Sequence, residues 1–148
     1  MATKPHVLIT GAAGLVGGIV RQHWGDRYRL RLADIQPVSD LADHEESIKL
    51  DIRDLEAFTE ACRDIDVVLH LAADRSPSAD FYETLIDLNL IGCYNGFEAA
   101  RRVVFASSIN AVLGYRGSSA VPWDVPIFPQ NVYGATKCFG EALGQPAV

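Results

Sequence analysis

A glycine-rich loop directly after the first apolar run is the feature that most constrains how this chain can fold. Residues 7–9 are apolar and are followed by Gly11, Gly14 and Gly17 at regular spacing. Residues 15–24 then carry apolar side chains at helical spacing, so the sequence predicts a strand, a tight loop and a helix. Glycines in such a loop let the backbone approach a bound phosphate, and a helix amino terminus attracts negative charge. A tight turn without a ligand is the alternative interpretation.

Short apolar runs and helical stretches alternate along the rest of the chain. Asp54 is placed to cap one of the helices. The alternation predicts an α/β fold, a doubly wound parallel sheet of about five strands with helices on both faces. In such a sheet, ligands bind at the carboxyl ends of the strands, where the strand order reverses. We expect further strands at residues 28–34, 47–50, 67–71 and 103–106, helices at 55–62, at 80–100 and from about Tyr133, and a long loop over 114–130.

Composition excludes several classes of protein. With 148 residues the chain is expected to form one domain, and its net charge of −6 argues against nucleic acid as a partner. Cys62, Cys93 and Cys138 show neither a disulfide pattern nor metal-binding spacing, so no metal site is expected. The amino-terminal apolar run is too short for a signal peptide or a membrane span, and we expect a cytoplasmic protein.

His70 lies at the end of an expected apolar strand. A histidine packed in the core is more common at such a position than one that binds a ligand.

An acidic residue at the end of the second expected strand sharpens the ligand prediction. A carboxylate at the position of Asp34 accepts hydrogen bonds from the ribose hydroxyls of NAD and repels the extra phosphate of NADP. No arginine occurs at residues 35–37 to favour that phosphate. We therefore predict NAD as the cofactor, with an incidental turn residue as the alternative interpretation of Asp34.

Three residues in the last third of the chain have side chains suited to proton transfer. Tyr133 and Lys137 are one helical turn apart, so they share one face of a helix. A phenol is a poor base near neutral pH, and a neighbouring ammonium favours its anionic form. Ser108, at the end of the last expected strand, can donate a hydrogen bond to a substrate oxygen. The trio indicates hydride transfer coupled to proton exchange, whereas a surface pair is the alternative interpretation of the tyrosine and lysine.

Together these motifs resemble the short-chain dehydrogenase/reductase superfamily. The resemblance covers nearly the whole chain and points to the extended branch, the NAD-dependent epimerase/dehydratase group, and within it to uronate dehydrogenases and related sugar dehydrogenases. It is carried by the glycine loop, by residues 104–108 and by residues 133–141. It implies a Rossmann-like fold in which residues 1–148 form the NAD-binding domain, without most of the C-terminal substrate-binding part of the family.

The resemblance also implies roles for individual residues. Ser108, Tyr133 and Lys137 match the catalytic trio. Ser108 is preferred to Ser107 because its spacing from the tyrosine in the sequence fits that of the family. Asn89 matches a helix asparagine near the cofactor. The residues expected to bind NAD are Gly11, Ala13, Gly14, Leu15, Val16, Gly17, Asp34, Asp51, Ile52, Leu71, Ala72, Ala73, Asn89, Tyr133 and Lys137.

Contacts to the substrate are expected from Ser108, Tyr133, Arg75 and Asn110. Arg75 can pair with a carboxylate or phosphate, and a solvated loop position is the alternative for it and for Asn110. Uronate dehydrogenases carry Asn-His after the catalytic serine, where this chain has Ile109 and Asn110, so its substrate can differ from theirs. The 4,6-dehydratases need an acidic pair there, which counts against dehydration.

Three functions follow from the motifs and the resemblance. The leading hypothesis is an NAD-dependent oxidoreductase that transfers hydride between NAD and a hydroxyl carbon of a sugar or uronic acid. The second is a nucleotide-sugar epimerase, in which hydride leaves and returns, and the third is a non-catalytic NAD-binding fragment. The expected partner is a small sugar, with no nucleic acid and no membrane. The resemblance also implies a homodimer through the helices that start near Asp80 and Tyr133.

Overall fold

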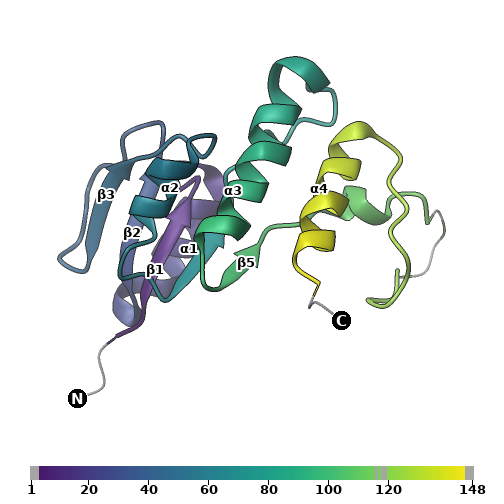
Figure 1. Cartoon of the computed structure of the whole chain (residues 1–148). Helices are drawn as coiled ribbons and strands as arrows, with labels where there is room; N and C mark the ends of the chain where they lie inside the picture. Colours follow the sequence, from purple (N-terminus) through teal and green to yellow (C-terminus); the bar gives the residue numbers. More distant parts are fainter. Residues whose placement is uncertain (1–3, 116, 118–119, 146–148) are drawn as a thin grey trace.

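A parallel sheet organises the molecule (Figure 1). The computed structural model describes residues 4–115, 117 and 120–145. Within these residues five strands pair in the order β3-β2-β1-β4-β5, and every pair is parallel. The strands are β1 (His6–Thr10), β2 (Arg29–Asp34), β3 (Glu45–Lys49), β4 (Val67–His70) and β5 (Val103–Phe105). The predicted α/β class and the doubly wound order are confirmed.

The strand order reverses beside β1, and this reversal opens a crevice at one end of the sheet. The chain runs outward from β1 to β3 and then crosses back to β4 on the other side of β1. Thr10, the last residue of β1, pairs with Ala33 on β2 and with His70 on β4. Because the three strands end together, the segments that follow them meet at the same edge of the sheet.

Helices cover both faces of the sheet. Alternate residues of β1 point to opposite faces, so Leu8 belongs to one hydrophobic cluster and Val7 and Ile9 to the other. Phe58 packs into the Leu8 cluster, and Trp24 packs against the Ile9 cluster. The helical segments are α1 (Leu15–Trp24), η1 (Gly25–Arg27), α2 (Leu55–Ala61), η2 (Phe81–Ile91), α3 (Gly92–Ala99), η3 (Ile109–Val112) and α4 (Val132–Leu143).

The expected helix over residues 80–100 forms, but its first half is wider than an α-helix. Asp80 caps it by accepting hydrogen bonds from the backbone N–H groups of Tyr82 and Glu83. The N–H of Leu85 then donates to the carbonyl of Asp80, five residues back, which is the spacing of a π-helix. The regular helix α3 follows and ends at Ala99, and the backbone of the next residue, Ala100, is extended. The cap of α2 by Asp54, which accepts from the N–H of Ala57 at 2.9 Å, is as predicted.

A buried histidine ties the two central strands together beneath the crevice. Nδ1 of His70 lies 2.7 Å from Oγ1 of Thr10, and this oxygen also accepts hydrogen bonds from the N–H groups of Leu71 and Ala72. With its acceptor positions used, the threonine hydroxyl donates its proton to the imidazole. Burial, with a smaller effect of the Lys137 charge, lowers the pKa of His70 to about 4. The ring is therefore neutral and packed, which confirms the expectation from the sequence.

An ion pair joins α1 to β3. Nε and Nη2 of Arg21 donate to the two carboxylate oxygens of Glu45 at 2.7 and 2.6 Å, and the Glu45 side chain is only 3% exposed. The hydrogen bond from Arg21 holds the pKa of Glu45 below its usual value. A carboxylate with a depressed folded-state pKa stabilises the fold above its unfolded pKa, and this stabilisation is lost as the pH falls through the folded pKa.

We therefore expect Glu45→Gln to lower the free energy of unfolding by about 1–3 kcal/mol at neutral pH. Urea titrations of both proteins should show that this difference shrinks in acid, below the ordinary glutamate pKa. Glu60→Gln is the matched control, because Glu60 pairs with Arg63 on the surface and both side chains are well exposed. Equal losses for the two variants at neutral pH would contradict the prediction.

No helix among the described residues is long and apolar enough to cross a bilayer. The predicted loop over residues 114–130 contains no helix or strand where it is described, and Arg116, Ser118 and Ser119 lie outside the described residues.

Candidate functional site

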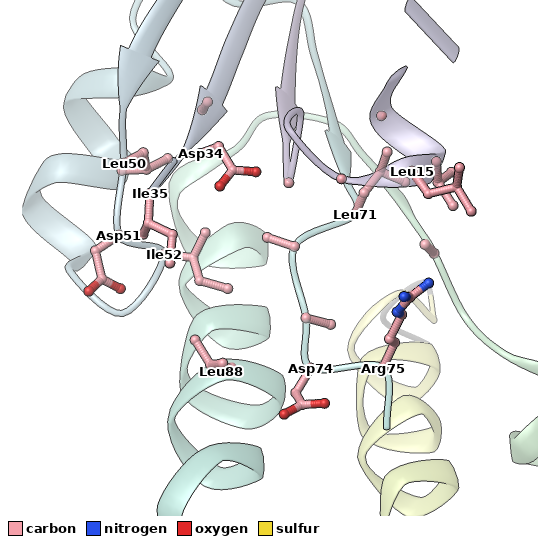
Figure 2. Close-up of a pocket in the computed structure, with 18 of the residues that line it drawn as sticks. Leu15, Asp34, Ile35, Leu50, Asp51, Ile52, Leu71, Asp74, Arg75 and Leu88 are labelled. Carbon is pink, nitrogen blue, oxygen red and sulfur yellow. The ribbon is translucent and has the colours of Figure 1, made fainter. Parts of the chain in front are cut away.

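A cavity of about 570 Å³ opens where β1, β2 and β4 end. Figure 2 shows side chains from separate segments of the chain around it. Most of the residues predicted from the sequence line it: Gly11, Gly14, Leu15, Val16, Gly17, Asp34, Asp51, Ile52, Leu71, Ala72, Ala73, Arg75, Tyr133 and Lys137. The predicted residues that do not line it are Ala13, Asn89, Ser108 and Asn110.

Glycines shape the first wall of the cavity. Gly11 has a φ of +71°, and a Cβ at this position would lie 2.8 Å from the backbone nitrogen of Ala72. A Cβ on Gly17 would lie 2.7 Å from the carbonyl oxygen of Gly11, so both positions exclude a side chain. Gly14 precedes α1 and provides no side-chain cap. The first N–H groups of α1 therefore lack a side-chain acceptor beside the cavity, an arrangement that favours an anion.

Asp34 presents a fixed carboxylate to the cavity (Figure 2). Its Oδ2 accepts a hydrogen bond from the N–H of Ala13 at 3.0 Å, and its Oδ1 accepts one from the N–H of Gln36 at 3.0 Å. These bonds join the glycine loop to the turn after β2. Ala13 thus does not line the cavity but holds Asp34 through its backbone N–H. A carboxylate held in this way is suited to accept hydrogen bonds from a diol.

The segment after β3, together with one residue of η2, forms an apolar wall of the cavity, and a charged residue lies at its edge. Leu50, Ile52 and Leu88 line this part of the cavity, and a flat apolar group would fit between such side chains. Asp51 stands at the edge, where Nη2 of Arg53 lies 2.6 Å from its Oδ2. The hydrogen bond from Arg53 holds the pKa of Asp51 below its usual value, so this carboxylate is ionised.

Asn89 lies behind the loop that follows β4. Its Oδ1 accepts a hydrogen bond from the N–H of Asp74 at 2.8 Å, and its Nδ2 donates to the carbonyl of Asp74 at 2.9 Å. Nδ2 also donates to Oγ1 of Thr136 on α4 at 3.2 Å. The side chain is 3% exposed, so it joins the loop to α4 and is not itself part of the cavity wall.

Tyr133 and Lys137 enter the cavity from α4. They are 7% and 5% exposed, and Nζ of Lys137 lies 5.8 Å from the centroid of the tyrosine ring. Nζ donates a hydrogen bond to the carbonyl of Ala106 at 3.0 Å, which anchors the ammonium at the end of β5. Burial lowers the pKa of Lys137. The helix spacing predicted from the sequence thus places a phenol and an ammonium side by side.

Two consecutive serines after β5 have different surroundings. Ser107 lines the cavity, and its hydroxyl donates to the carboxylate of Glu141 on α4. Ser108 caps η3, and its Oγ accepts hydrogen bonds from the backbone N–H and the side-chain Nδ2 of Asn110. The structure therefore brings Ser107 to the cavity wall and Ser108 next to it, and the catalytic role of Ser108 stays a prediction.

Comparison with known proteins places this chain in a family. The family described as NAD dependent epimerase/dehydratase matches residues 7–147. The chain belongs to this family.

Several proteins named for their enzyme activities resemble the chain over nearly all of its length. A uronate dehydrogenase from Pseudomonas putida is 34% identical, over 95% of this chain and 55% of that protein. An L-arabinose 1-dehydrogenase (NAD(P)(+)) from Haloferax volcanii is also 34% identical, over 93% of this chain and 59% of that protein. A mutant uronate dehydrogenase from Agrobacterium tumefaciens, solved with NAD, superposes with a TM-score of 0.83 at 36% identity, over 94% of this chain and 54% of that chain. The chain spans about half the length of these relatives.

Several lining residues were not predicted from the sequence. Some of them lie next to a predicted site residue, and others lie at the end of an expected strand or on the expected long helix. The ends of the expected strands were therefore the signal that could have indicated most of them. The sequence alone did not show that the backbone or side chains of these residues face the cavity. These residues are Ala33, Ile35, Leu50, Asp74, Leu88, Ala106 and Ser107.

Proposed function

We propose that residues 1–148 form the NAD-binding domain of an NAD-dependent oxidoreductase that acts on a hydroxyl carbon of a sugar or uronic acid. The observation that carries the proposal is the joining, in one cavity, of Asp34 and the α1 amino terminus with Tyr133 and Lys137. The named sugar and uronate dehydrogenases among the relatives support the class of substrate.

The walls of the cavity suit the parts of NAD one by one. The amino terminus of α1 would hold the pyrophosphate, and Asp34 would accept hydrogen bonds from the adenosine ribose. The apolar wall with Leu50 and Ile52 would hold the adenine, and residues 71–73 would lie along the nicotinamide side. When bound, NAD supplies the hydride acceptor.

The chain's own residues manage the proton and the substrate oxygen. Tyr133, as phenolate, takes the proton of the sugar hydroxyl while the hydride leaves the same carbon, so the alcohol is oxidised to a carbonyl or lactone. The ammonium of Lys137 stabilises the phenolate, and Ser108 donates a hydrogen bond to the oxygen that loses its proton. Arg75 lines the cavity, and Figure 2 shows its side chain extending toward the side where Leu15 lies; it would pair with an anionic group.

The test is to incubate the chain with NAD and a panel of aldoses and uronic acids, and to follow NADH and the products. Net NADH with one of these sugars is the expected result. An isomerised nucleotide sugar without net NADH would identify an epimerase. Saturable NAD binding with no turnover of any sugar would identify a non-catalytic NAD-binding domain.

Asp34→Asn tests the choice of cofactor separately from turnover. The amide keeps the size of the side chain and one acceptor but removes the charge, so we expect NAD affinity to fall about tenfold, as a charged hydrogen bond becomes a neutral one. The preference for NAD over NADP should shrink in parallel, because the repulsion of the extra phosphate is lost. Calorimetry with both cofactors measures this, with Asp26→Asn on the exposed segment η1 as control. An unchanged ratio of the two affinities would rule out this role for Asp34.

We also propose that the protein is cytoplasmic and forms a homodimer through α4 and η2. The free thiols of Cys62, Cys93 and Cys138 support a reducing compartment. Burial raises the pKa of both Cys62 and Cys93 to about 11, so these thiols are not reactive nucleophiles. Sedimentation equilibrium tests the proposed homodimer, and a monomer at all concentrations would contradict it.

A further inference from the structure

Two asparagine side chains connect Ser108 to the start of α4. Nδ2 of Asn131 donates to Oδ1 of Asn110 at 2.7 Å, and Nδ2 of Asn110 donates to Oγ of Ser108 at 3.2 Å. At the other end, Oδ1 of Asn131 accepts a hydrogen bond from the backbone N–H of Gly134 at 2.7 Å. The bonds form one continuous series from the backbone of α4 to the serine.

Chemistry fixes the direction of every hydrogen bond in this series. The N–H of Gly134 can only donate, so Asn131 must turn its oxygen toward it and its Nδ2 toward Asn110. Asn110 must then present its oxygen to Asn131, which leaves its Nδ2 facing Ser108. A single backbone N–H thus sets the orientation of both amides.

The series leaves Ser108 with one proton to give. Its Oγ accepts from Nδ2 of Asn110 and from the backbone N–H of the same residue, both at 3.2 Å. A hydroxyl oxygen has two acceptor positions and one proton, so with both positions occupied the proton is directed to a third group. Ser108 is only partly buried and follows Ser107 of the cavity wall.

Close packing holds Asn110 in its place. A Cβ on Gly134 would lie 2.4 Å from the carbonyl oxygen of Asn110, so the backbone of α4 rests directly on this residue. Both ends of the Asn110 amide are already bonded within the protein. A substrate contact by this amide, expected from the sequence, is left with the second Nδ2 proton or the second acceptor position of Oδ1.

We propose that Asn110 and Asn131 are positioning residues, which orient Ser108 as a hydrogen-bond donor toward the reacting substrate oxygen and couple it to the helix that carries Tyr133. This proposal rests on the proposed function for its catalytic consequence. The orientation of the two amides is independent of turnover.

Asn131→Asp is the deciding variant. Aspartate is as good an N-cap as asparagine, so the bond to Gly134 and the fold should persist. Its second carboxylate oxygen cannot donate, however, so Asn110 turns over to donate to it and presents its own oxygen to Ser108. Ser108 then gives its proton to Asn110 instead of the substrate. We expect kcat to fall about 10- to 100-fold at every pH, with NAD affinity unchanged.

Three controls separate this effect from others. Asp54→Asn makes the reverse exchange at the cap of α2, away from Ser108, and should leave kcat unchanged. A fall in kcat that disappears at high pH would show that the new charge acts on Tyr133 and would overturn the proposal. Asn131→Ser keeps a cap without adding charge but lacks the amide Nδ2 that donates to Asn110, so it should also lower kcat. Full activity in this variant would count equally against the proposal.

NMR of the side-chain amides provides a readout that needs no turnover. In the unmodified chain the Nδ2 protons of Asn110 should show nuclear Overhauser effects to the β-protons of Ser108, and in Asn131→Asp these should be replaced by effects to residue 131. Persistence of the Ser108 effects in the variant would overturn the proposal, whether or not any sugar is oxidised. Absence of turnover by the unmodified chain would instead refute the proposed function while the NMR result still decides the orientation.

Discussion

Replacing Tyr133 by phenylalanine is expected to lower kcat for sugar oxidation by about 10²- to 10⁴-fold while leaving NAD affinity unchanged. The substitution removes only the hydroxyl that takes the substrate proton. The ring is nearly buried, and its packing beside Nζ of Lys137 is retained in phenylalanine. Initial rates with the best sugar of the panel give kcat, and calorimetry gives the affinity for NAD.

Tyr94→Phe is the matched control for that experiment. Tyr94 lies on α3, is 46% exposed and donates to Glu98 at 3.3 Å, so it loses a hydroxyl without affecting the cavity. Full activity in both variants would show that Tyr133 does not accept the proton. If the unmodified chain binds NAD but oxidises no sugar, the two variants should bind NAD alike, and the cavity would serve binding alone.

Gly11→Ala should have the largest effect on the fold, a loss of about 2–4 kcal/mol in the free energy of unfolding. Two costs add here: the φ of +71° is unfavourable for alanine, and its Cβ would lie 2.8 Å from the backbone nitrogen of Ala72. Relief of that contact requires the glycine loop to move away from residues 71–73. We therefore expect NAD affinity to fall as well. Urea unfolding and calorimetry measure the two effects.

The same substitution a few residues later should act in the opposite direction. A Cβ on Gly18 meets no atom within 4 Å, and Gly18 lies inside α1, where alanine is the better helix former. Gly18→Ala should therefore stabilise the protein by up to about 1 kcal/mol and leave NAD affinity unchanged. Similar losses of stability in the two variants would show that neither the backbone angle nor the close approach of Gly11 matters.

The sequence predicted the sheet because each strand ends at a clear signal. Gly11 follows one apolar run and Asp34 ends another, and the reversal of strand order brings such ends together. Most of the residues that line the cavity could therefore be inferred. The widened turns of η2 were not predictable, since Leu85 and Asn89 fit the spacing of an ordinary helix equally well. The change lies in backbone hydrogen bonds that side-chain patterns do not record.

The part of the cavity beside Tyr133 and Lys137 was harder to predict than the part beside Asp34. The family's spacing in sequence between serine and tyrosine selects Ser108, whereas Ser107 is the serine that lines the cavity and Ser108 follows it. For Asn110 the sequence showed a polar residue near a serine and could not show that Asn131, the cap of α4, donates a hydrogen bond to its side chain. Contacts between segments far apart in the chain decide such roles, and no local pattern contains them.

The pairing of Thr10 with His70 makes the scaffold of the crevice insensitive to acidity. Because the pKa of His70 is lowered to about 4, the imidazole keeps one protonation state from mildly acidic to alkaline solution. The hydrogen bonds that fix Leu71 and Ala72 through Thr10 are then equally constant across that interval. A pH–rate profile recorded there would be free of any contribution from the titration of this histidine.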